Sequence, residues 1–147
     1  MGAASHYRRS LGENYLTIPK AASYELRFTN SGNPQLDQTN FLDAIFMVRN
    51  GLPDVNTYVR DGNFEAHQVS GNVYNPGPFA EWQFSPASGL SAGFGFGQPN
   101  HEGNQVAFLQ GPSATLTQVL ALPPGLYTVQ WLDAAGRVLV RHRVAQR

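Results

Sequence analysis

The feature that most constrains this chain is the shortness of its apolar segments. Val, Ile, Thr and aromatic residues occur in brief runs separated by clusters of Gly, Pro, Asn and Ser, and no apolar pattern of helical period is long. Tyr24, Leu26 and Phe28 alternate with polar residues, which is typical of a strand with one face toward solvent. The sequence therefore predicts an all-β protein.

We expect about nine strands. They cover residues 15–18, 24–30, 41–48, 63–66, 81–85, 105–110, 115–122, 127–133 and 137–144. The last two are predicted to form a hairpin, because Gly136 suits a tight turn between them. The Gly-rich stretch 85–99 is predicted to be an irregular loop. This many short strands in 147 residues predict one domain, residues 1–147, folded as a jelly-roll β-sandwich of two antiparallel sheets.

The charge balance argues against partners that bind through bulk electrostatics. Ten basic and ten acidic residues give a formal net charge of zero, so we expect neither nucleic acid nor a membrane surface as partner. No run of eighteen apolar residues occurs, and residues 1–9 lack the apolar segment of a signal peptide. Eleven Asn and ten Gln outnumber the 20 charged residues. Such amides both donate and accept hydrogen bonds, which suits a neutral ligand rich in hydroxyl groups.

No catalytic constellation is found, and we expect no enzyme. The chain has no cysteine, which excludes disulfides, thiolate metal sites and cysteine nucleophiles. A glycosidase needs two carboxyl groups that flank the bond. Glu81, Glu102, Asp133 and Asp37 could supply such a pair, but their spacing selects none. The histidines, including His67, show no metal-ligand spacing.

Several segments together resemble the galactose-binding-like β-sandwich family, which includes many extracellular carbohydrate-binding modules. Its first strands are resembled by Asp-Gly-Asn-Phe-Glu at 61–65, Trp-Gln-Phe at 82–84, Gly-Asn-Gln-Val-Ala-Phe-Leu-Gln at 103–110, Leu-Thr-Gln at 116–118 and Gly-Leu-Tyr-Thr-Val at 125–129. Its last two strands are resembled by Tyr-Glu-Leu-Arg-Phe at 24–28 and by residues 37–45. The resemblance implies an extracellular or cell-surface protein.

These segments stand in reversed order along the chain. Residues 1–50 resemble the last strands of the family, 51–60 form a connector, and 61–147 resemble the first strands. The order is that of a circular permutation, natural or engineered, which is tolerated where chain termini lie close together. The alternative is a fragment of a tandem array, made of the tail of one module and the head of the next. The pattern departs from the family after Gln130.

The resemblance also implies a structural calcium site. Its ligands would be the carboxylates of Asp43 and Glu65 and backbone carbonyls near Gly62 and Asp43. Ca²⁺ takes six to eight oxygen ligands and often combines carboxylates with main-chain carbonyls. The alternative is that Asp43 and Glu65 are ordinary acids at strand ends, with solvent or arginine partners.

A sugar-binding surface needs flat rings for C–H groups and neutral polar groups for hydroxyls. Trp82 and Trp131 share strand faces with apolar residues, so we expect both to be buried. Loop residues are the better candidates for contact with a ligand. They are Tyr74, Asn75, Phe94, Phe96, Gln98 and Asn104. The rings among them could instead fold back over the end of the sandwich.

The combined prediction is a non-catalytic carbohydrate-binding module that recognises a polysaccharide or oligosaccharide and carries structural Ca²⁺. The first alternative is a structural module that assembles into homo-oligomers through exposed strand edges, without sugar binding. The second alternative is a small glycan hydrolase.

Overall fold

The computed structural model describes residues 8–30, 39–51, 58–92, 103–111, 113–135 and 140–146. Ten strands and no helix are found in these residues. The strands are β1 (Arg8–Ile18), β2 (Ala22–Asn30), β3 (Thr39–Arg49), β4 (Asn72–Tyr74), β5 (Gln83–Phe84), β6 (Ser88–Ala92), β7 (Gln105–Gln110), β8 (Thr115–Leu122), β9 (Gly125–Ala135) and β10 (Val140–Gln146). The described part of the chain thus holds no helix with the length and apolar character to span a membrane.

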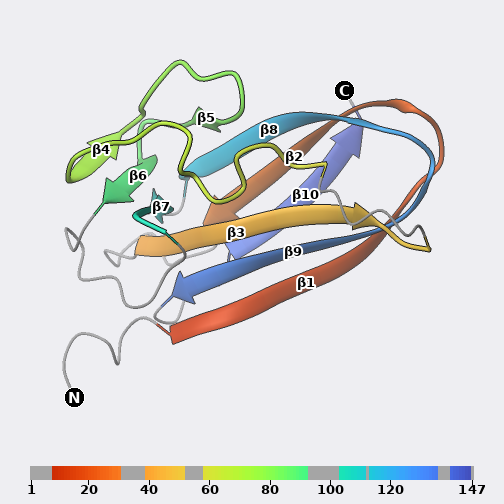
Figure 1. Ribbon diagram of the computed structural model, residues 1–147, viewed down its shortest axis with the longest axis horizontal. Coiled ribbons are helices and arrows are strands. Elements are labelled where there is room, and N and C mark those ends of the chain that lie inside the picture. Colours follow the sequence, from red (N-terminus) through yellow and green to blue (C-terminus); the bar gives the residue numbers. More distant parts are fainter. Residues whose placement is uncertain are drawn as a thin grey trace.

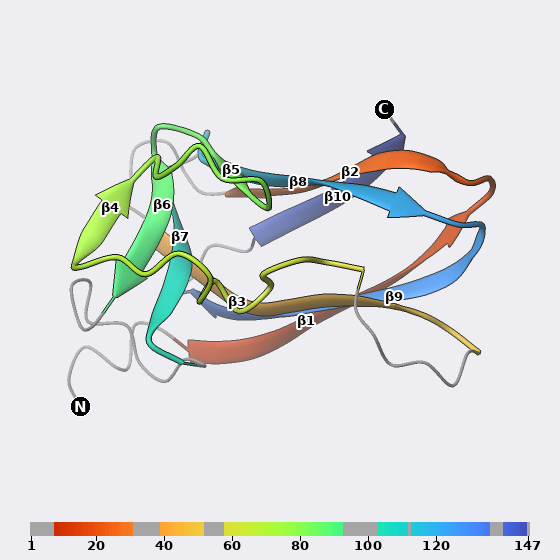
Figure 2. The same cartoon turned by 45° about the horizontal axis from the view of Figure 1, so that its top comes forward.

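The strands form two antiparallel sheets packed face to face (Figure 1). The six-stranded sheet has the order β1-β9-β3-β7-β6-β4, and the four-stranded sheet has the order β10-β2-β8-β5. Figure 2 shows the four-stranded sheet lying over the long strands β1, β9 and β3. The predicted all-β sandwich of two antiparallel sheets is confirmed.

The core lies between the two sheets and follows from the period-two pattern of the strands. Leu26 and Phe28 of β2 are fully buried, as are Tyr127 and Val129 of β9. Alternate residues of a strand point to opposite faces, so β2, β8 and β9 each supply an apolar row to the core. The Trp131 ring meets Phe28 edge to face, with 5.5 Å between ring centroids. The predicted burial of both tryptophans, Trp82 and Trp131, is confirmed.

Strands from the beginning of the chain lie inside both sheets. β3 pairs with β9 on one side and β7 on the other, and β2 lies between β10 and β8. A bulge interrupts the β3–β9 register between Asp43 and Phe46, and Ala44 there has a φ of 49°. The bulge turns the backbone of β3 toward the segment that begins at residue 61.

Two strand predictions were wrong. β9 and β10 do not form a hairpin, because β9 pairs with β1 and β3 in one sheet and β10 pairs with β2 in the other. Residues 63–66 form turns and bends instead of a strand. Asp61 and Phe64 adopt positive φ angles of 50° and 58°, and that left-handed backbone cannot continue a strand.

The predicted loop at 85–99 was wrong in part, because β6 occupies residues 88–92. Glycine is common in loops, but Gly89 is needed for the packing of β6 against β4. A Cβ atom at Gly89 would lie 2.0 Å from the carbonyl oxygen of Val73, so only glycine lets β6 approach β4 this closely. β4 itself has three residues and was not predicted.

Candidate functional site

The loop between β4 and β5 encloses a cleft of about 290 Å³. Its lining consists of residues 75–79 and 82–84, namely Asn75, Pro76, Gly77, Pro78, Phe79, Trp82, Gln83 and Phe84. Five of these eight residues are aromatic or proline, and Asn75 and Gln83 contribute amide groups. We call this hollow the loop cleft.

The start of the loop is fixed to the six-stranded sheet. Asn75 has a φ of 46°, and its N–H donates to the carbonyl of Ser88 on β6 over 2.7 Å. The Gly77–Pro78 peptide bond is cis. Farther along, the side-chain amide of Gln83 donates to the Phe79 carbonyl over 3.2 Å. These contacts hold the loop backbone in one shape around the cleft.

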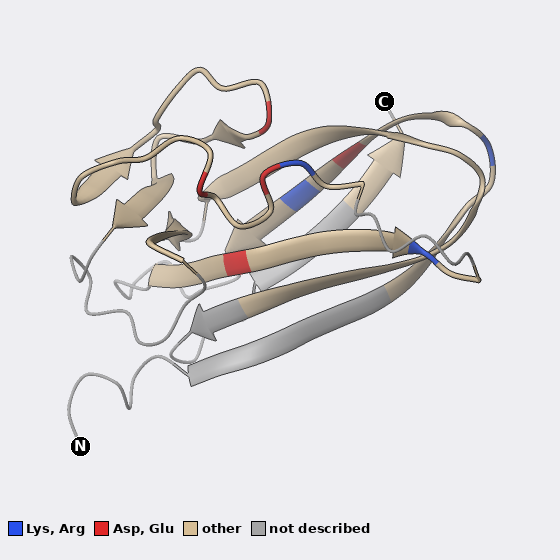
Figure 3. Cartoon of the chain, viewed as in Figure 1, with Lys and Arg blue, Asp and Glu red and all other residues tan. Residues whose placement is uncertain are grey.

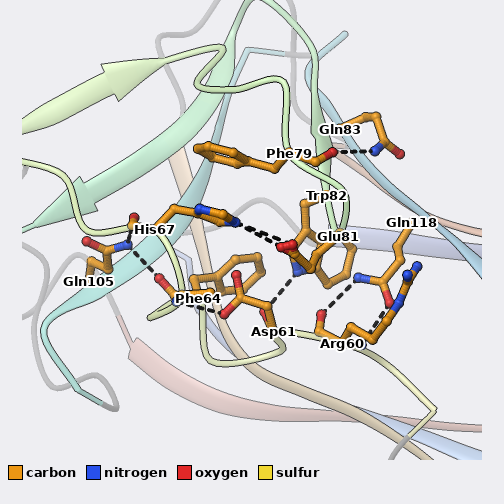
Figure 4. A network of polar contacts seen from close by, with 11 residues as sticks. Arg60, Asp61, Phe64, His67, Phe79, Glu81, Trp82, Gln83, Gln105 and Gln118 are labelled. Carbon is orange, nitrogen blue, oxygen red and sulfur yellow. Dashed lines mark hydrogen bonds and ion pairs between the residues drawn. The ribbon is translucent and has the colours of Figure 1, made fainter.

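A histidine holds the far side of the loop (Figure 4). The His67 Nε2 atom lies 2.8 Å from Glu81 Oε1, and the His67 ring stacks on Phe79 with 3.8 Å between centroids and 2° between planes. The hydrogen bond from His67 lowers the pKa of Glu81 below its ordinary value, against the opposing effect of burial. His67 therefore holds Phe79, which lines the cleft, directly by ring stacking. It also holds the loop two residues later through its bond to Glu81.

Trp82 forms the fixed inner wall of the loop cleft. Its indole N–H donates to the carbonyl of Asp61 over 2.8 Å, and its ring packs against Phe64 with 5.3 Å between centroids. Burial raises the pKa of Asp61 above its ordinary value, and the carboxylate accepts the N–H of Ala66 over 3.1 Å. Trp82 is only 2% exposed. Its ring is therefore held in the core.

The segment that carries His67 rests on a buried amide. The Gln105 side chain donates to the carbonyls of Phe64 and His67 over 2.6 and 2.7 Å, and it accepts the N–H of Val69 over 3.0 Å. Gln105 lies on β7 and is fully buried. Three hydrogen bonds from one side chain thus give residues 64–69 a defined shape without regular secondary structure.

A second hollow lies next to the loop cleft. It measures about 530 Å³ and is bordered by Tyr58, Arg60 and Ala80 on one side and by β2 and β8 on the other. Phe79 lines the loop cleft and Ala80 lines the second hollow, so consecutive residues of one loop contribute to both. We call the second hollow the Arg60 groove.

The structure places the six predicted ligand residues in different ways. Tyr74 is 45% exposed; its ring packs edge to face on Phe108, and its hydroxyl donates to Gln110 Oε1 over 2.7 Å. Asn75, the next residue, lines the loop cleft. Asn104 is exposed and does not line either hollow; its N–H donates to Glu65 over 3.0 Å. Phe94, Phe96 and Gln98 lie outside the described residues.

The predicted calcium ligands lie on segments that touch, but protein donors hold two of them. The Gly62 carbonyl accepts the N–H of Ile45, which follows Asp43 by two residues. Glu65 Oε2 accepts the N–H groups of Asn104 and Gln105, each over 3.0 Å. These oxygens therefore already serve as hydrogen-bond acceptors within the protein.

Within the described residues, no three His, Asp or Glu side chains lie close enough together to hold a metal ion. The calcium site stays a prediction.

Sequence reasoning missed the clamp formed by His67, Phe79 and Glu81. His67 and Glu81 are 14 positions apart, a spacing that matches no known motif. The pairing of Arg60 with Gln118, 58 positions apart, was also missed. Neither carries a local signal in the sequence, because each depends on how distant segments pack.

The chain was compared with protein-family models, with curated proteins and with solved structures, and no match was found in any of the three.

Proposed function

We propose that the chain is a non-catalytic carbohydrate-binding module that holds a glycan at the loop cleft. The observation that carries the proposal is the lining of this cleft. It combines the rings of Phe79, Trp82 and Phe84 with the amides of Asn75 and Gln83, and no charged side chain is among its described lining residues.

This lining suits the two kinds of surface that a sugar presents. The C–H groups of a pyranose pack against rings and prolines, and its hydroxyls need groups that both donate and accept hydrogen bonds. Tyr74, next to Asn75, is one of the most exposed large apolar side chains described, and its ring and hydroxyl contact Phe108 and Gln110 of β7. Charged side chains are few among the described residues (Figure 3), which fits an uncharged sugar residue at this cleft.

The resemblance to the galactose-binding-like family supports the same proposal and adds two further parts to it. One is an extracellular or cell-surface location. The other is structural calcium, bound near Asp43, Gly62 and Glu65. The permuted order of the segments is also part of the proposal, because β2 and β3 pair with strands of the later segment as a permuted module would require.

A second candidate function is self-assembly through strand edges. β1 is an edge strand of 11 residues, and β9 is its only partner among the described strands. Long edge strands offer backbone groups to another chain unless charges, proline or bulges protect them. A self-assembling protein of this kind would elute from a gel-filtration column as an oligomer and would bind no glycan.

Affinity electrophoresis against a panel of soluble glycans separates the candidates. A binder is retarded by at least one glycan, and a hydrolase shortens the glycan and releases reducing ends. Asn75→Ala and Gln83→Ala should each weaken retardation roughly 2- to 10-fold, the usual effect of one lost hydrogen bond. Asn63→Ala removes an exposed amide outside the cleft and is the matched control. The proposal would be overturned if no glycan retards the wild-type protein, or if all three variants lose retardation equally.

A further inference from the structure

Arg60 is held in place by one buried glutamine. The N–H of Arg60 donates to Gln118 Oε1 over 2.8 Å, and the Gln118 amide donates back to the Arg60 carbonyl over 2.9 Å. Gln118 lies on β8 and is fully buried, so it is itself immobile. Both backbone groups of Arg60 are therefore fixed by a single side chain of the four-stranded sheet (Figure 4).

The guanidinium group of Arg60 is fixed as well. One of its NH₂ groups donates to the carbonyl of Val119 over 2.8 Å. This carbonyl is accessible because β5 pairs with β8 only at Leu116 and Thr117 and leaves the edge open beyond them. A guanidinium carries five N–H donors in a planar fork, and the bond to Val119 uses one. The others are available at the rim of the Arg60 groove, where Arg60 is exposed.

Arg60 forms no ion pair with a carboxylate in the described part of the chain, although its charge contributes in part to the lowered pKa of Glu81. The ion pairs found there are Arg27 with Glu25 and His67 with Glu81. Asp61, the next residue, points its carboxylate toward the N–H of Ala66. Arg60 thus differs from Arg27, which already has an acidic partner on its own strand.

The rest of the Arg60 groove has room for a sugar ring. Tyr58 forms one wall, and the core fixes its ring, which packs edge to face on Tyr127 with 5.4 Å between centroids. Small residues, namely Ser23, Ala80 and Ala121, form part of the remaining lining. A rigid aromatic ring beside a fixed guanidinium fork suits a ligand with an apolar ring face and a carboxylate.

We infer that the Arg60 groove binds the carboxylate of a uronic acid residue, so that the polysaccharide recognised by this module is an acidic one. The inference rests on the proposed carbohydrate binding and adds the chemical class of the ligand. The guanidinium of Arg60 binds the carboxylate through its free donors, and Tyr58 packs against the ring. Because Arg60 is already ordered, binding costs little side-chain entropy.

The test uses glycan pairs that differ only at the carboxyl group. Polygalacturonate, alginate and glucuronoxylan are each compared with their carboxyl-reduced counterparts by affinity electrophoresis at fixed ionic strength. We expect at least one acidic glycan to bind wild-type protein about 10-fold or more tightly than its reduced counterpart, the range for a charged hydrogen bond. Added salt should weaken this preference.

Variants assign the preference to Arg60. Arg60→Gln should abolish the difference in affinity between the acidic glycan and its reduced counterpart, while the backbone bonds to Gln118 survive the substitution. Arg60→Lys should retain only part of the preference, since lysine keeps the charge and loses the fork. Arg27→Gln removes an arginine of β2 that does not line the groove and is the matched control. Melting temperatures verify that each variant is folded.

The outcomes distinguish the two proposals. Equal binding of acidic and reduced glycans, or a preference that persists in Arg60→Gln, overturns the inference and leaves carbohydrate binding in place. Retardation by no glycan overturns the proposed function, and the inference with it.

Discussion

The N–H of Ile45 donates a hydrogen bond to the carbonyl of Gly62 over 3.0 Å. This bond joins the bulge of β3 to the segment that carries His67. It anchors residues 61–64 against the six-stranded sheet, and Trp82 in turn binds the carbonyl of Asp61. The inner wall of the loop cleft is thereby tied to the strand bulge.

Gly62→Ala should disrupt this anchor. A Cβ atom at Gly62 would lie 1.8 Å from the carbonyl oxygen of Ile45, a backbone atom that cannot rotate away. We expect a loss of unfolding free energy of about 3 kcal/mol or more, measured by urea denaturation. Gly71→Ala is the control, because its Cβ would meet open space and only its φ of 68° adds strain, roughly 1–2 kcal/mol. Equal losses in the two variants would contradict the close contact.

Glu81→Gln should change the pH dependence of stability. The folded-state pKa of Glu81 is lowered by His67, so the stability contributed by the carboxylate is fully present above the ordinary value of 4.5. It is lost as the pH falls through the lower folded-state pKa. Melting temperatures of wild type and Glu81→Gln should therefore differ most near neutral pH and converge in acid.

The raised pKa of Asp61 acts in the opposite sense; its largest cause is burial, which both proteins share, and the charge of Glu81 adds a smaller part that Glu81→Gln removes. In a His67→Gln background, Glu81→Gln should alter the pH profile much less, because the hydrogen bond that is the largest cause of the lowered pKa of Glu81 is gone. A pH-dependent difference that persists without His67 would assign the effect to another partner.

Gln105→Leu should destabilise the loop that carries His67. The substitution leaves the Phe64 and His67 carbonyls and the Val69 N–H without their buried partner. Each unsatisfied group costs about 1–3 kcal/mol, partly recovered as the loop relaxes, so we expect a loss of roughly 2–4 kcal/mol in urea denaturation. Gln68→Leu, at an exposed position, should cost about 0.5 kcal/mol or less. A small effect at Gln105 would mean that water replaces its amide.

Calcium removal tests the ligand set implied by the family resemblance. Chelation by EDTA should lower the melting temperature, and added Ca²⁺ should restore it, because the ion would join the segments of Asp43 and Glu65. Glu65→Gln should remove the response to EDTA. An unchanged transition in wild type would remove calcium from the proposal.

Local patterns in the sequence predicted the strands of the central core well. The alternation in residues 24–30 and 115–122 depends on a period of two, which is a property of each strand alone, and β2 and β8 lie where that alternation predicted them. The burial of Trp82 and Trp131 followed from the same reasoning. Gly89 shows the limit, because a glycine that allows close strand packing looks the same in sequence as one in a loop.

By itself, then, the sequence determined that the chain is an all-β sandwich and that strands such as β2 bury one apolar face. Only the tertiary structure decided that β9 and β10 belong to different sheets and that His67 meets Glu81. It also decided that Gln118 fixes Arg60. The physical reason is the distance along the chain over which each effect acts. Side-chain alternation involves neighbouring residues, whereas strand pairing and buried hydrogen bonds join residues that are far apart in the sequence and show no local pattern.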